Sequence, residues 1–385
     1  MKQLLVIATV IATVWPTEML CRDTQLKTPS PAYVVHIPGL WAIEMSPDEK
    51  YLAAFVVRKL NGATPTAQVQ LWDFRSGILV QTHTLPVPEP TPGYQWGRIC
   101  VRFTSDGKLL VLYTGGDSLH VLSTANLEEV RTAQFHLQTN IDGVEVSPTA
   151  HLVAVRKSGD VRVYDLDSGE EVRSWTNNQY PEFKMSILLG VEPRLTALAW
   201  RRDGGSLAIA VADNSPCLRG GGTIHILELA SNKAEVTFRV PLLPSSIAFG
   251  TGNDLYVASN TCGGVFTHWT LDLLIFDSTS GQETGKIPAG KVGIRNYIAI
   301  SASRQILLAY ADREKTTFAG FEEGLEIKDE QWQAWDLANG KVVLTLQATE
   351  HMSTRDYPAL SSSGRFVYAN RAQEVDIFSL PVATK

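Results

Sequence analysis

The sequence has little excess positive charge and few long apolar runs. Its 385 residues contain 34 lysines and arginines against 40 aspartates and glutamates, which gives a net charge of −6 at pH 7. No global positive field is available to hold a phosphate backbone, so we expect no nucleic-acid partner. After the N-terminus no segment approaches the roughly 18 uncharged apolar residues that cross a bilayer, so we expect no membrane span.

Linear catalytic motifs are also missing. The chain contains no G-x-S-x-G elbow, H-E-x-x-H helix, P-loop or dinucleotide glycine pattern. Its eight histidines are scattered singly, and neither His225 nor His268 has a sequence-local partner that would mark it as a base. We therefore assign no catalytic residue and expect no cofactor and no bound metal.

Cysteine is scarce, with four residues in the chain. Cys217 and Cys262 are too widely spaced for a C-x-x-C redox or zinc motif, and no histidine pair lies near them at ligand spacing. In an exported protein they fit a disulfide, which forms only if their loops approach closely; free thiols are the alternative. Cys100 lies in an alternating, strand-like stretch and is expected to be an inert buried thiol.

The N-terminus predicts export. Lys2 precedes an apolar run from Leu4 to Trp15, which has the length of a signal-peptide core and is too short for a membrane span. We expect residues 1–21 to be a signal peptide and the protein to be periplasmic or extracellular. A buried first strand or helix is the alternative, because no good A-x-A cleavage site follows, and lipid attachment at Cys21 is a further option.

Seven copies of one pattern fill the rest of the chain. Each copy begins with a tight turn of Ser, Pro, Asp or Gly between apolar, β-rich stretches, as in a hairpin. A second strand-turn-strand element follows, and no helical period appears over a useful length. The first elements start at residues 46, 104, 147, 201, 250, 301 and 361, and the second elements at 69, 119, 161, 224, 273, 332 and 375.

Each copy thus supplies four short antiparallel strands, which can bury both faces of their sheet by radial closure into a propeller. The seventh copy stops after its third strand, whereas residues 33–38 form a lone strand before the first copy. We therefore predict an all-β fold, a seven-bladed β-propeller of four-stranded antiparallel blades that occupies residues 32–381 as one domain. The N-terminal strand closes the ring by pairing with residues 375–380, which protects an otherwise exposed edge.

The Ser-Pro-Asp turns and the aromatic-aspartate dipeptides that end third strands resemble the WD40 and WD40-like (YVTN-type) propeller superfamily. The dipeptides are Trp72-Asp73, Tyr164-Asp165, Phe276-Asp277 and Trp335-Asp336. The Gly-His dipeptide typical of WD40 repeats is absent from all seven copies, so the tetrad that contains its histidine cannot be mapped here. The sequence is more similar to the looser bacterial, exported propellers, a resemblance that implies the fold and is almost silent on function.

The long connections are expected on one rim of the propeller, at residues 58–68, 86–97, 176–193, 213–222, 259–271 and 312–331. Long loops gathered on one face of a rigid scaffold commonly carry binding sites, and aromatic side chains give large contact areas with few rotors. The alternative is that these aromatics fold under their own loops. The candidate binding residues are Tyr94, Trp96, Tyr180, Phe183, Phe266, His268, Trp269, Phe318, Phe321 and Trp332.

Three charged residues occupy equivalent positions in the first strands of blades one to three. Glu44, Arg102 and Glu145 stand where the other four blades have alanine, and their charges alternate in sign. Partly desolvated groups of this kind need partners. We interpret them as a structural ion-pair chain, with a ligand site that lines the channel as the alternative.

These features favour a non-enzymatic, monomeric scaffold that binds a protein, peptide or glycan on its insertion-rich face. Propeller enzymes assemble their sites from several blades, so the absence of a linear motif leaves catalysis unsupported without excluding it. The alternative is therefore a propeller enzyme, such as a lactonase-like hydrolase or a quinoprotein, with its site at the channel mouth.

Overall fold

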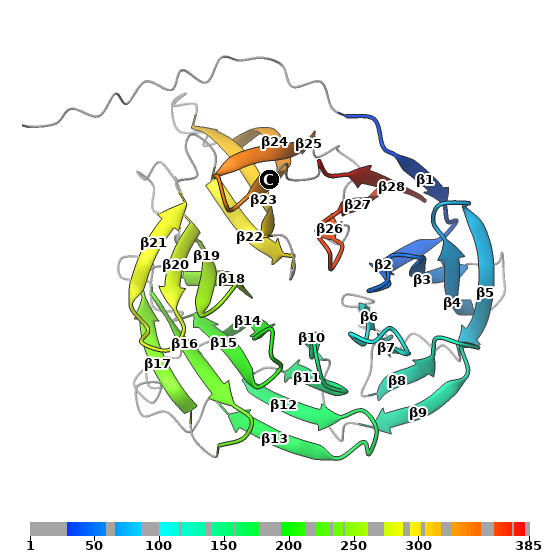
Figure 1. Cartoon of the computed structure of the whole chain (residues 1–385), viewed down its shortest axis with the longest axis horizontal. Helices are drawn as coiled ribbons and strands as arrows, with labels where there is room; N and C mark the ends of the chain where they lie inside the picture. The colour runs from blue at the N-terminus through cyan, green and yellow to red at the C-terminus, as the bar shows by residue number, and fades with distance from the viewer. Residues whose placement is uncertain are drawn as a thin grey trace, which may run out of the picture.

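The computed structural model describes residues 29–381 with gaps, and its strands form a ring of seven sheets around a central axis (Figure 1). The described part of the chain contains no helix long and apolar enough to cross a membrane. The gaps are residues 59–65, 86–99, 115–117, 135–140, 158, 177–193, 213–220, 232–233, 242, 261–272, 288–292, 302–304, 317–324, 348–357 and 372.

Every sheet has four antiparallel strands, as the repeats predict. From the axis outward, blade 1 contains β2 (Leu40–Met45), β3 (Tyr51–Arg58), β4 (Thr66–Asp73) and β5 (Ile78–Leu85); blade 2 contains β6 (Cys100–Phe103), β7 (Leu109–Tyr113), β8 (Ser118–Ser123) and β9 (Glu129–Gln134); blade 3 contains β10 (Gly143–Val146), β11 (Leu152–Lys157), β12 (Asp160–Asp165) and β13 (Glu171–Thr176); blade 4 contains β14 (Arg194–Trp200), β15 (Ser206–Ala212), β16 (Gly222–Glu228) and β17 (Ala234–Val240).

The remaining blades repeat this order. Blade 5 contains β18 (Leu243–Phe249), β19 (Asp254–Asn260), β20 (Leu273–Asp277) and β21 (Glu283–Ile287); blade 6 contains β22 (Gly293–Ile300), β23 (Ile306–Thr316), β24 (Leu325–Asp336) and β25 (Lys341–Gln347); blade 7 contains β26 (Ala359–Leu360), β27 (Phe366–Arg371), β28 (Glu374–Ser379) and, outermost, β1 (Tyr33–His36).

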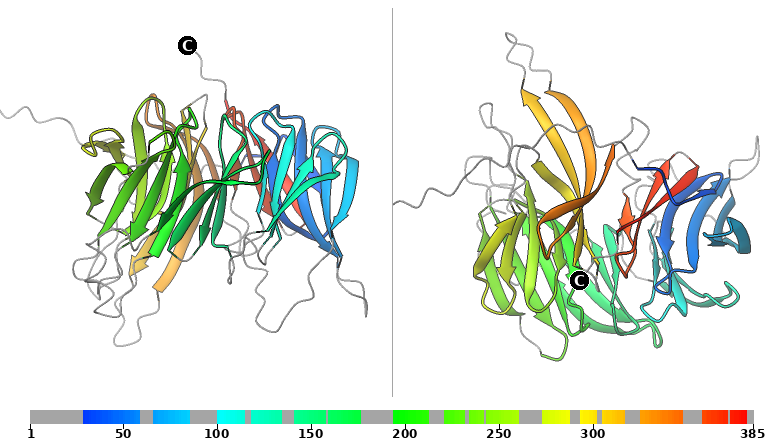
Figure 2. Two further views of the ribbon diagram at one scale, coloured as in Figure 1. Left: turned by 90° about the horizontal axis from the view of Figure 1, so that it is seen from below. Right: turned by 45° about the horizontal axis from the view of Figure 1, so that its top comes forward.

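The antiparallel order gives the ring two different rims. The turns between first and second strands and between third and fourth strands lie on one of them, the turn rim. Second-to-third connections and the crossings between blades join strand ends on the other, the loop rim. Figure 2 shows the blades from the side, with these two rims at opposite ends of the strands.

Each blade buries both faces against its neighbours. In β3, Ala53 and Phe55 belong to the apolar cluster shared with blade 2, whereas Leu52, Ala54 and Val56 belong to the cluster shared with blade 7. This alternation follows from the two-residue period of a strand, which sends successive side chains to opposite faces. The interior is therefore a series of apolar interfaces between neighbouring blades.

The aromatic-aspartate dipeptides shape the third-to-fourth turns. In blade 1 the Asp73 carboxylate accepts hydrogen bonds from the backbone N–H groups of Arg75 and Ser76, both at 3.0 Å, and Gly77 follows with a φ of 67°. The Asp277 carboxylate accepts equivalent backbone bonds in blade 5, and hydrogen bonds from the Thr279 hydroxyl and from Ser280 lower its pKa to about 2. The dipeptide is thus a local turn-forming device, because an aspartate side chain hydrogen-bonds readily to the backbone two residues on.

The ring closes as predicted. β1 pairs antiparallel with β28, in a register that places Tyr33 opposite Ile377 and His36 opposite Glu374. The amide of Ala32 extends this pairing with a bond of 2.7 Å to the carbonyl of Ile377. The first described strand of the chain therefore completes the last blade, and no separate closing element is needed.

One part of the predicted loop set needs correction. Residues 312–331 of blade 6 are expected to form a loop, but β23 continues to Thr316 and β24 begins at Leu325, and the two strands stay paired up to Thr316 opposite Leu325. A register shift between Ala311 and Arg313 lets the hairpin continue beyond the blade. It projects past the neighbouring strands in Figure 2.

A side-chain link on the turn rim joins blade 1 to blade 7. The Glu49 carboxylate is 1% exposed and accepts hydrogen bonds from Ser363 and Arg365, including one of 2.8 Å from the Nε of Arg365. Burial alone would raise the pKa of Glu49, but the bonds from Ser363 and Arg365 hold it below its usual value. The carboxylate is therefore ionised at neutral pH and pairs with Arg365 across the closure.

Glu49 also has a left-handed backbone, with a φ of 54°. The equivalent turn position is glycine in blades 2, 4 and 7, at Gly107 with a φ of 70° and at Gly204 and Gly364 with a φ of 69°. Glycine adopts this conformation without a Cβ penalty, whereas other residues pay roughly 1–2 kcal/mol. Blade 1 accepts that strain at the position where a carboxylate can reach blade 7.

We predict that Glu49→Ala destabilises the fold more than Glu49→Gly, by about 1 kcal/mol, because both lose the link to Arg365 and only alanine keeps the backbone strain. Urea unfolding of the two variants measures this difference. Gly107→Ala is the control, since it adds the strain without removing an ion pair. Equal stability of the two Glu49 variants would contradict the assignment.

Candidate functional site

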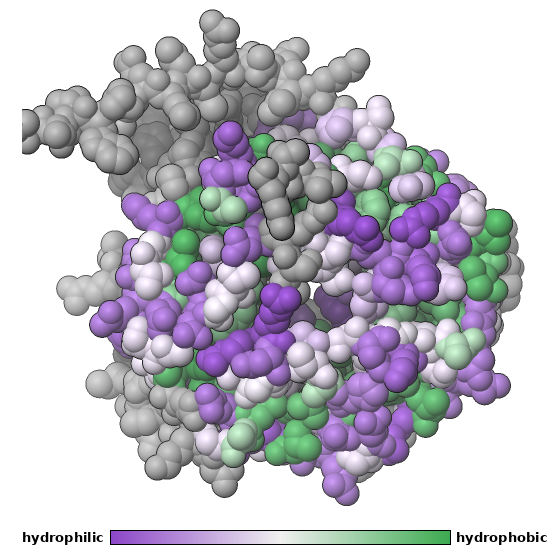
Figure 3. Space-filling view, in the orientation of Figure 1, coloured by the Kyte–Doolittle hydropathy of each residue, from purple (hydrophilic) through white to green (hydrophobic). Residues whose placement is uncertain are grey.

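The first strands of the blades enclose a cavity of about 520 Å³ along the axis of the ring. This lies within the roughly 300–1,000 Å³ of typical small-molecule sites. Figure 3 shows the hollow at the axis, with hydrophilic residues gathered around its opening. The seven equivalent first-strand positions all line this axial cavity, and they are Glu44, Arg102, Glu145, Ala199, Ala248, Ala299 and Ala359.

The lining of the axial cavity is asymmetric. Blades 1 to 3 contribute the charged residues Glu44, Arg102 and Glu145, and blades 4 to 7 contribute alanine at the same position. Alanine leaves the space near the axis unfilled, so the cavity owes part of its volume to these four blades. At this first-strand position the cavity thus has charged groups on one side and small apolar groups on the other.

Arg102 and Glu44 form an ion pair across the junction of blades 1 and 2. The Nη1 of Arg102 lies 3.3 Å from the Oε2 of Glu44 and also donates a 3.0 Å hydrogen bond to the carbonyl of Val101. The Tyr368 hydroxyl of blade 7 donates to the same carboxylate at 3.3 Å. The side chains of Arg102 and Glu44 are 35% and 25% exposed, so the pair is half-buried.

Glu145 lies on the other side of Arg102, in blade 3. Burial raises the pKa of both Glu44 and Glu145, and the Arg102 charge opposes this shift for each. Arg156 also lowers the pKa of Glu145 electrostatically, while its two Nη groups donate to the backbone carbonyls of Leu195 at 2.6 Å and Asp142 at 3.0 Å. Arg102 thus pairs directly with Glu44 and opposes the raised pKa of Glu145 through its charge, whereas a continuous ion-pair chain of the three residues stays a prediction.

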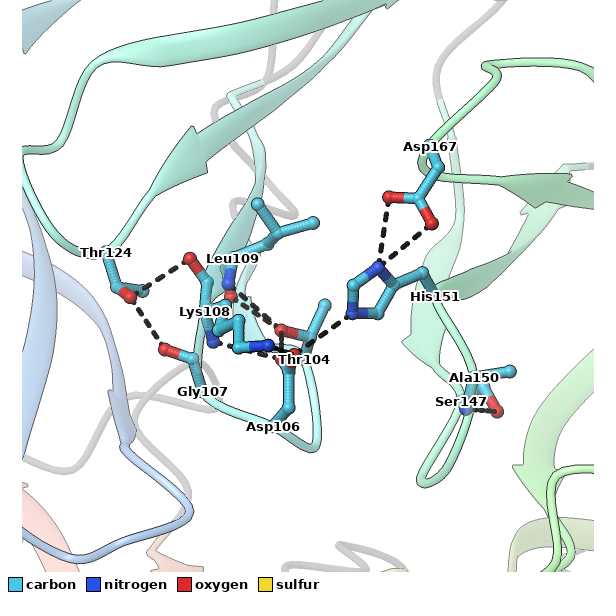
Figure 4. Close-up of polar contacts among 10 residues, drawn as sticks. All are labelled: Thr104, Asp106, Gly107, Lys108, Leu109, Thr124, Ser147, Ala150, His151 and Asp167. Carbon is cyan, nitrogen blue, oxygen red and sulfur yellow. Dashed lines mark hydrogen bonds and ion pairs between the residues drawn. The ribbon is translucent and has the colours of Figure 1, made fainter.

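The turn rim carries a second polar cluster that links blades 2 and 3 (Figure 4). The Nδ1 of His151 lies 3.0 Å from Asp167, and its Nε2 lies 3.2 Å from Asp106 of the neighbouring blade. Hydrogen bonding to Asp167, opposed by burial and helped by Asp106, raises the pKa of His151. The pKa of Asp106 is held at about 2, because hydrogen bonds from Lys108, Thr104 and His151 outweigh its burial.

Most of the predicted aromatic binding residues lie outside the described part of the chain. These residues are Tyr94, Trp96, Tyr180, Phe183, Phe266, His268, Trp269, Phe318 and Phe321. Cys217 and Cys262 lie outside it as well, so the disulfide stays a prediction. The same holds for residues 1–21 and the export that they predict.

Trp332 is described, and its assignment as a loop residue is corrected. It lies in β24, is 2% exposed and packs against Tyr310, with 5.2 Å between ring centroids. The extended β23–β24 hairpin places it in the apolar cluster shared with blade 7, together with Val367 and Phe378. Trp332 therefore serves the packing between blades 6 and 7.

Two further residues noted in the sequence are structural. His225 is fully buried beside Trp175, with 5.3 Å between ring centroids, and burial lowers its pKa to about 4, so it is neutral at physiological pH. Cys100 is a half-buried free thiol whose pKa burial raises to about 11. A protonated thiol is a poor nucleophile, which agrees with the expected inert role.

Sequence reasoning missed Tyr368 and Arg156. Tyr368 lies opposite Ala359 in the β26–β27 pair, and Tyr256 lies opposite Ala248 in the same way in blade 5. A tyrosine in the second strand opposite an alanine in the first strand is a pattern that an alignment of the second strands could have revealed. Arg156 carries no such pattern, because its carbonyl partner on Leu195 belongs to the next blade.

We predict that Arg102→Met destabilises the fold by roughly 1–3 kcal/mol at pH 7, between the values for exposed and fully buried ion pairs, because two carboxylates lose their shared cation. The cost falls as the pH drops and Glu44 and Glu145 become protonated. Denaturant unfolding at pH 7 and pH 4 measures both effects. An equal cost at the two pH values would contradict the shared-cation arrangement.

Glu145→Gln is the matched variant. Because the folded protein raises the pKa of Glu145, deprotonation favours the unfolded state, and stability is lost as the pH rises from the ordinary glutamate pKa through the folded value. Glutamine removes this loss, so the variant is more stable than the wild type at pH 7 and equal to it at pH 4. Destabilisation at pH 7 would show that the charge of Glu145 is a net stabiliser.

Comparison with known proteins bears on the fold alone. No family model matches the chain, and no curated protein matches its sequence. Among solved structures, a chain of the "Crystal Structure of Mitotic Checkpoint Complex" is similar, with a TM-score of 0.60 and 16% sequence identity, over 97% of this chain and 99% of that chain. The protein is thus a seven-bladed β-propeller, and it shares this fold with a chain of that complex.

Proposed function

We propose that the protein is a non-catalytic scaffold that binds a partner protein on its loop rim, over the mouth of the axial cavity. The observation that carries the proposal is the cavity of about 520 Å³, whose equivalent first-strand positions are charged on three adjacent blades and alanine on the other four. A partner group that enters it meets a fixed polarity, because the surrounding strands are held by neighbouring blades on both sides. Such preorganisation lowers the cost of binding.

The strand order supports the loop rim as the binding face. The long intervals between strands all join ends on this rim, for example between β3 and β4, between β19 and β20, and between β23 and β24. The sequence gives these connections most of the candidate aromatics, a residue class enriched in the energetically dominant parts of protein interfaces. The WD40-like architecture is compatible with this use.

The partner is proposed to be a folded protein or a peptide segment of one. The sequence places aromatic residues, a class common in protein interfaces, in several of these connections, and the charged part of the cavity wall can orient a single polar group of the partner. A glycan is the other ligand that aromatic surfaces fit, and removal of glycans from the partner distinguishes the two. We further propose that the protein belongs to the looser bacterial, exported propellers.

We predict that Trp269→Ala weakens binding of the partner by roughly 2 kcal/mol, which is about thirty-fold in Kd, and leaves folding intact. The reason is that an aromatic anchor contributes contact area without supporting the blades. The partner is first isolated by affinity capture from the exported fraction, and its affinity is then measured by calorimetry. Lys108→Ala is the control on the opposite rim and leaves Kd unchanged. Loss of folding in Trp269→Ala would instead assign this residue to the packing of its own loop.

We predict that the mature protein lacks residues 1–21 and joins Cys217 to Cys262, because an oxidising compartment favours the bond between two loops of adjacent blades. N-terminal sequencing of protein from the exported fraction tests the first part. Mass spectrometry of non-reduced peptides tests the second. An intact N-terminus on cytoplasmic protein would overturn export, and free thiols at both positions would remove the disulfide.

A further inference from the structure

The outermost strand of blade 1 presents an unprotected edge. β5 is the last strand of its sheet, and within the described residues it pairs with β4 on one side only. An unpaired strand edge exposes a row of N–H and C=O groups that another extended chain can use. Natural propellers leave such edges on every blade, so the side chains of the outermost strands decide whether an edge is protected.

The side chains of β5 differ from those of the outermost strands of blades 2 to 6; β1 of blade 7 also lacks a charged residue but has only four residues. Ile78 and Leu79 are 62% and 40% exposed, and β5 contains no charged residue. The same two positions after the turn are Glu128 and Glu129 in blade 2, and Glu170 and Glu171 in blade 3. Charged side chains protect sheet edges from pairing, and β9, β13, β17, β21 and β25 each contain at least one.

An exposed valine at the third position after the turn occurs in other blades as well, so it does not by itself distinguish β5. Val80 is the extra residue of a β-bulge, and Val130 and Val172 occupy the same bulge position in blades 2 and 3, where they are also exposed. The distinctive feature is therefore the apolar pair Ile78 and Leu79, which extends the exposed valine into a continuous apolar stretch at the start of β5.

The start of β5 is rigidly held. Phe74, in the turn that precedes it, is buried and contacts Tyr33 of β1 and Phe366 of β27, with 5.3 and 5.6 Å between ring centroids. The Asp73 carboxylate fixes the same turn through the amides of Arg75 and Ser76. A strand edge held in this way loses little entropy when a second strand pairs with it.

We propose that β5 binds a short, extended, uncharged segment of a partner protein by strand addition, with Ile78 and Leu79 covered by its apolar side chains. Main-chain hydrogen bonds supply affinity in this mode, and alternate side chains supply specificity. A charged residue opposite Ile78 or Leu79 would be desolvated without a partner, which is why the segment is uncharged. The site lies on the outer wall of the ring in Figure 1, away from the axial cavity, and is independent of the function proposed above.

The length of β5 favours a segment over a second copy of this chain. Its eight residues span about 26 Å, whereas a stable interface between folded proteins needs about 20–30 residues from each side. Pairing of two copies through β5 alone therefore falls short of a stable dimer. A peptide-like segment can place its whole contact area along the strand.

The experiment uses the full chain and a fluorescein-labelled octapeptide of alternating threonine and valine. A second octapeptide carries N-methyl groups on alternate residues, which remove its hydrogen-bond donors on one edge. The variant Ile78→Glu/Leu79→Glu installs the glutamate pair of blades 2 and 3 at exposed positions, so it keeps the fold, which circular dichroism and Tm verify. Leu79→Lys is a second variant, and Val130→Glu, at the bulge of blade 2, is the matched control.

We expect fluorescence anisotropy to show binding of the unmethylated peptide to the wild type and to Val130→Glu, and at least about tenfold weaker binding to both β5 variants. The N-methylated peptide loses binding to a similar extent. Equal binding to wild type and β5 variants overturns the proposal, and so does equal binding of the two peptides, which would indicate apolar contact without strand addition. A wild-type dimer that the β5 variants abolish, seen by sedimentation without peptide, overturns it in favour of a second copy.

Discussion

The structure depends on one constraint: each four-stranded blade has two apolar faces, and only neighbouring blades can cover them. Leu52 and Phe55 of the same strand illustrate this, because they enter the clusters shared with blade 7 and blade 2 respectively. An open arc of blades would leave two apolar faces in water. Closure of the ring is therefore a condition of stability for every blade, and the pairing of β1 with β28 meets it.

Packing between blades restricts the choice of residue less at two surfaces, which are the axis and the outer wall. At the axis, first-strand residues point toward empty space, so blades 4 to 7 can carry alanine where blades 1 to 3 carry Glu44, Arg102 and Glu145. At the outer wall, the last strand has no neighbour to pack against on its free edge, so blade 1 can carry Ile78 and Leu79 where blades 2 and 3 carry glutamates. Freedom from the packing requirement lets these positions differ between blades.

The fold was predictable from the sequence because its information is local and repeated. A turn followed by a β-rich run recurs seven times, and the lone strand before the first copy can complete only the seventh copy, which lacks a fourth strand. The pair of Arg102 with Glu44 was predictable too, since strand alignment places the two opposite charges at equivalent positions of neighbouring blades. Trp332 was not, because the polar sequence of 312–331 reads equally as a loop or as the paired hairpin that β23 and β24 form. Contacts between blades, such as Tyr368 with Glu44 or Arg156 with Leu195, depend on how neighbouring sheets are placed and leave no local pattern.

The departures from the repeat concentrate on one part of the ring. Glu49 stands where the turns of blades 2, 4 and 7 have glycine, the charged trio occupies blades 1 to 3, and the exposed apolar pair Ile78 and Leu79 belongs to blade 1. Glu49 has a structural reason, since it joins the blades at which the chain closes through Arg365. No such reason is visible for the apolar pair at the start of β5, because Ile78 and Leu79 are exposed, belong to none of the apolar clusters of the described residues and replace residues that would protect the edge. A repeat protein that relaxes its pattern at a position where packing gains nothing marks that position as a surface for another molecule.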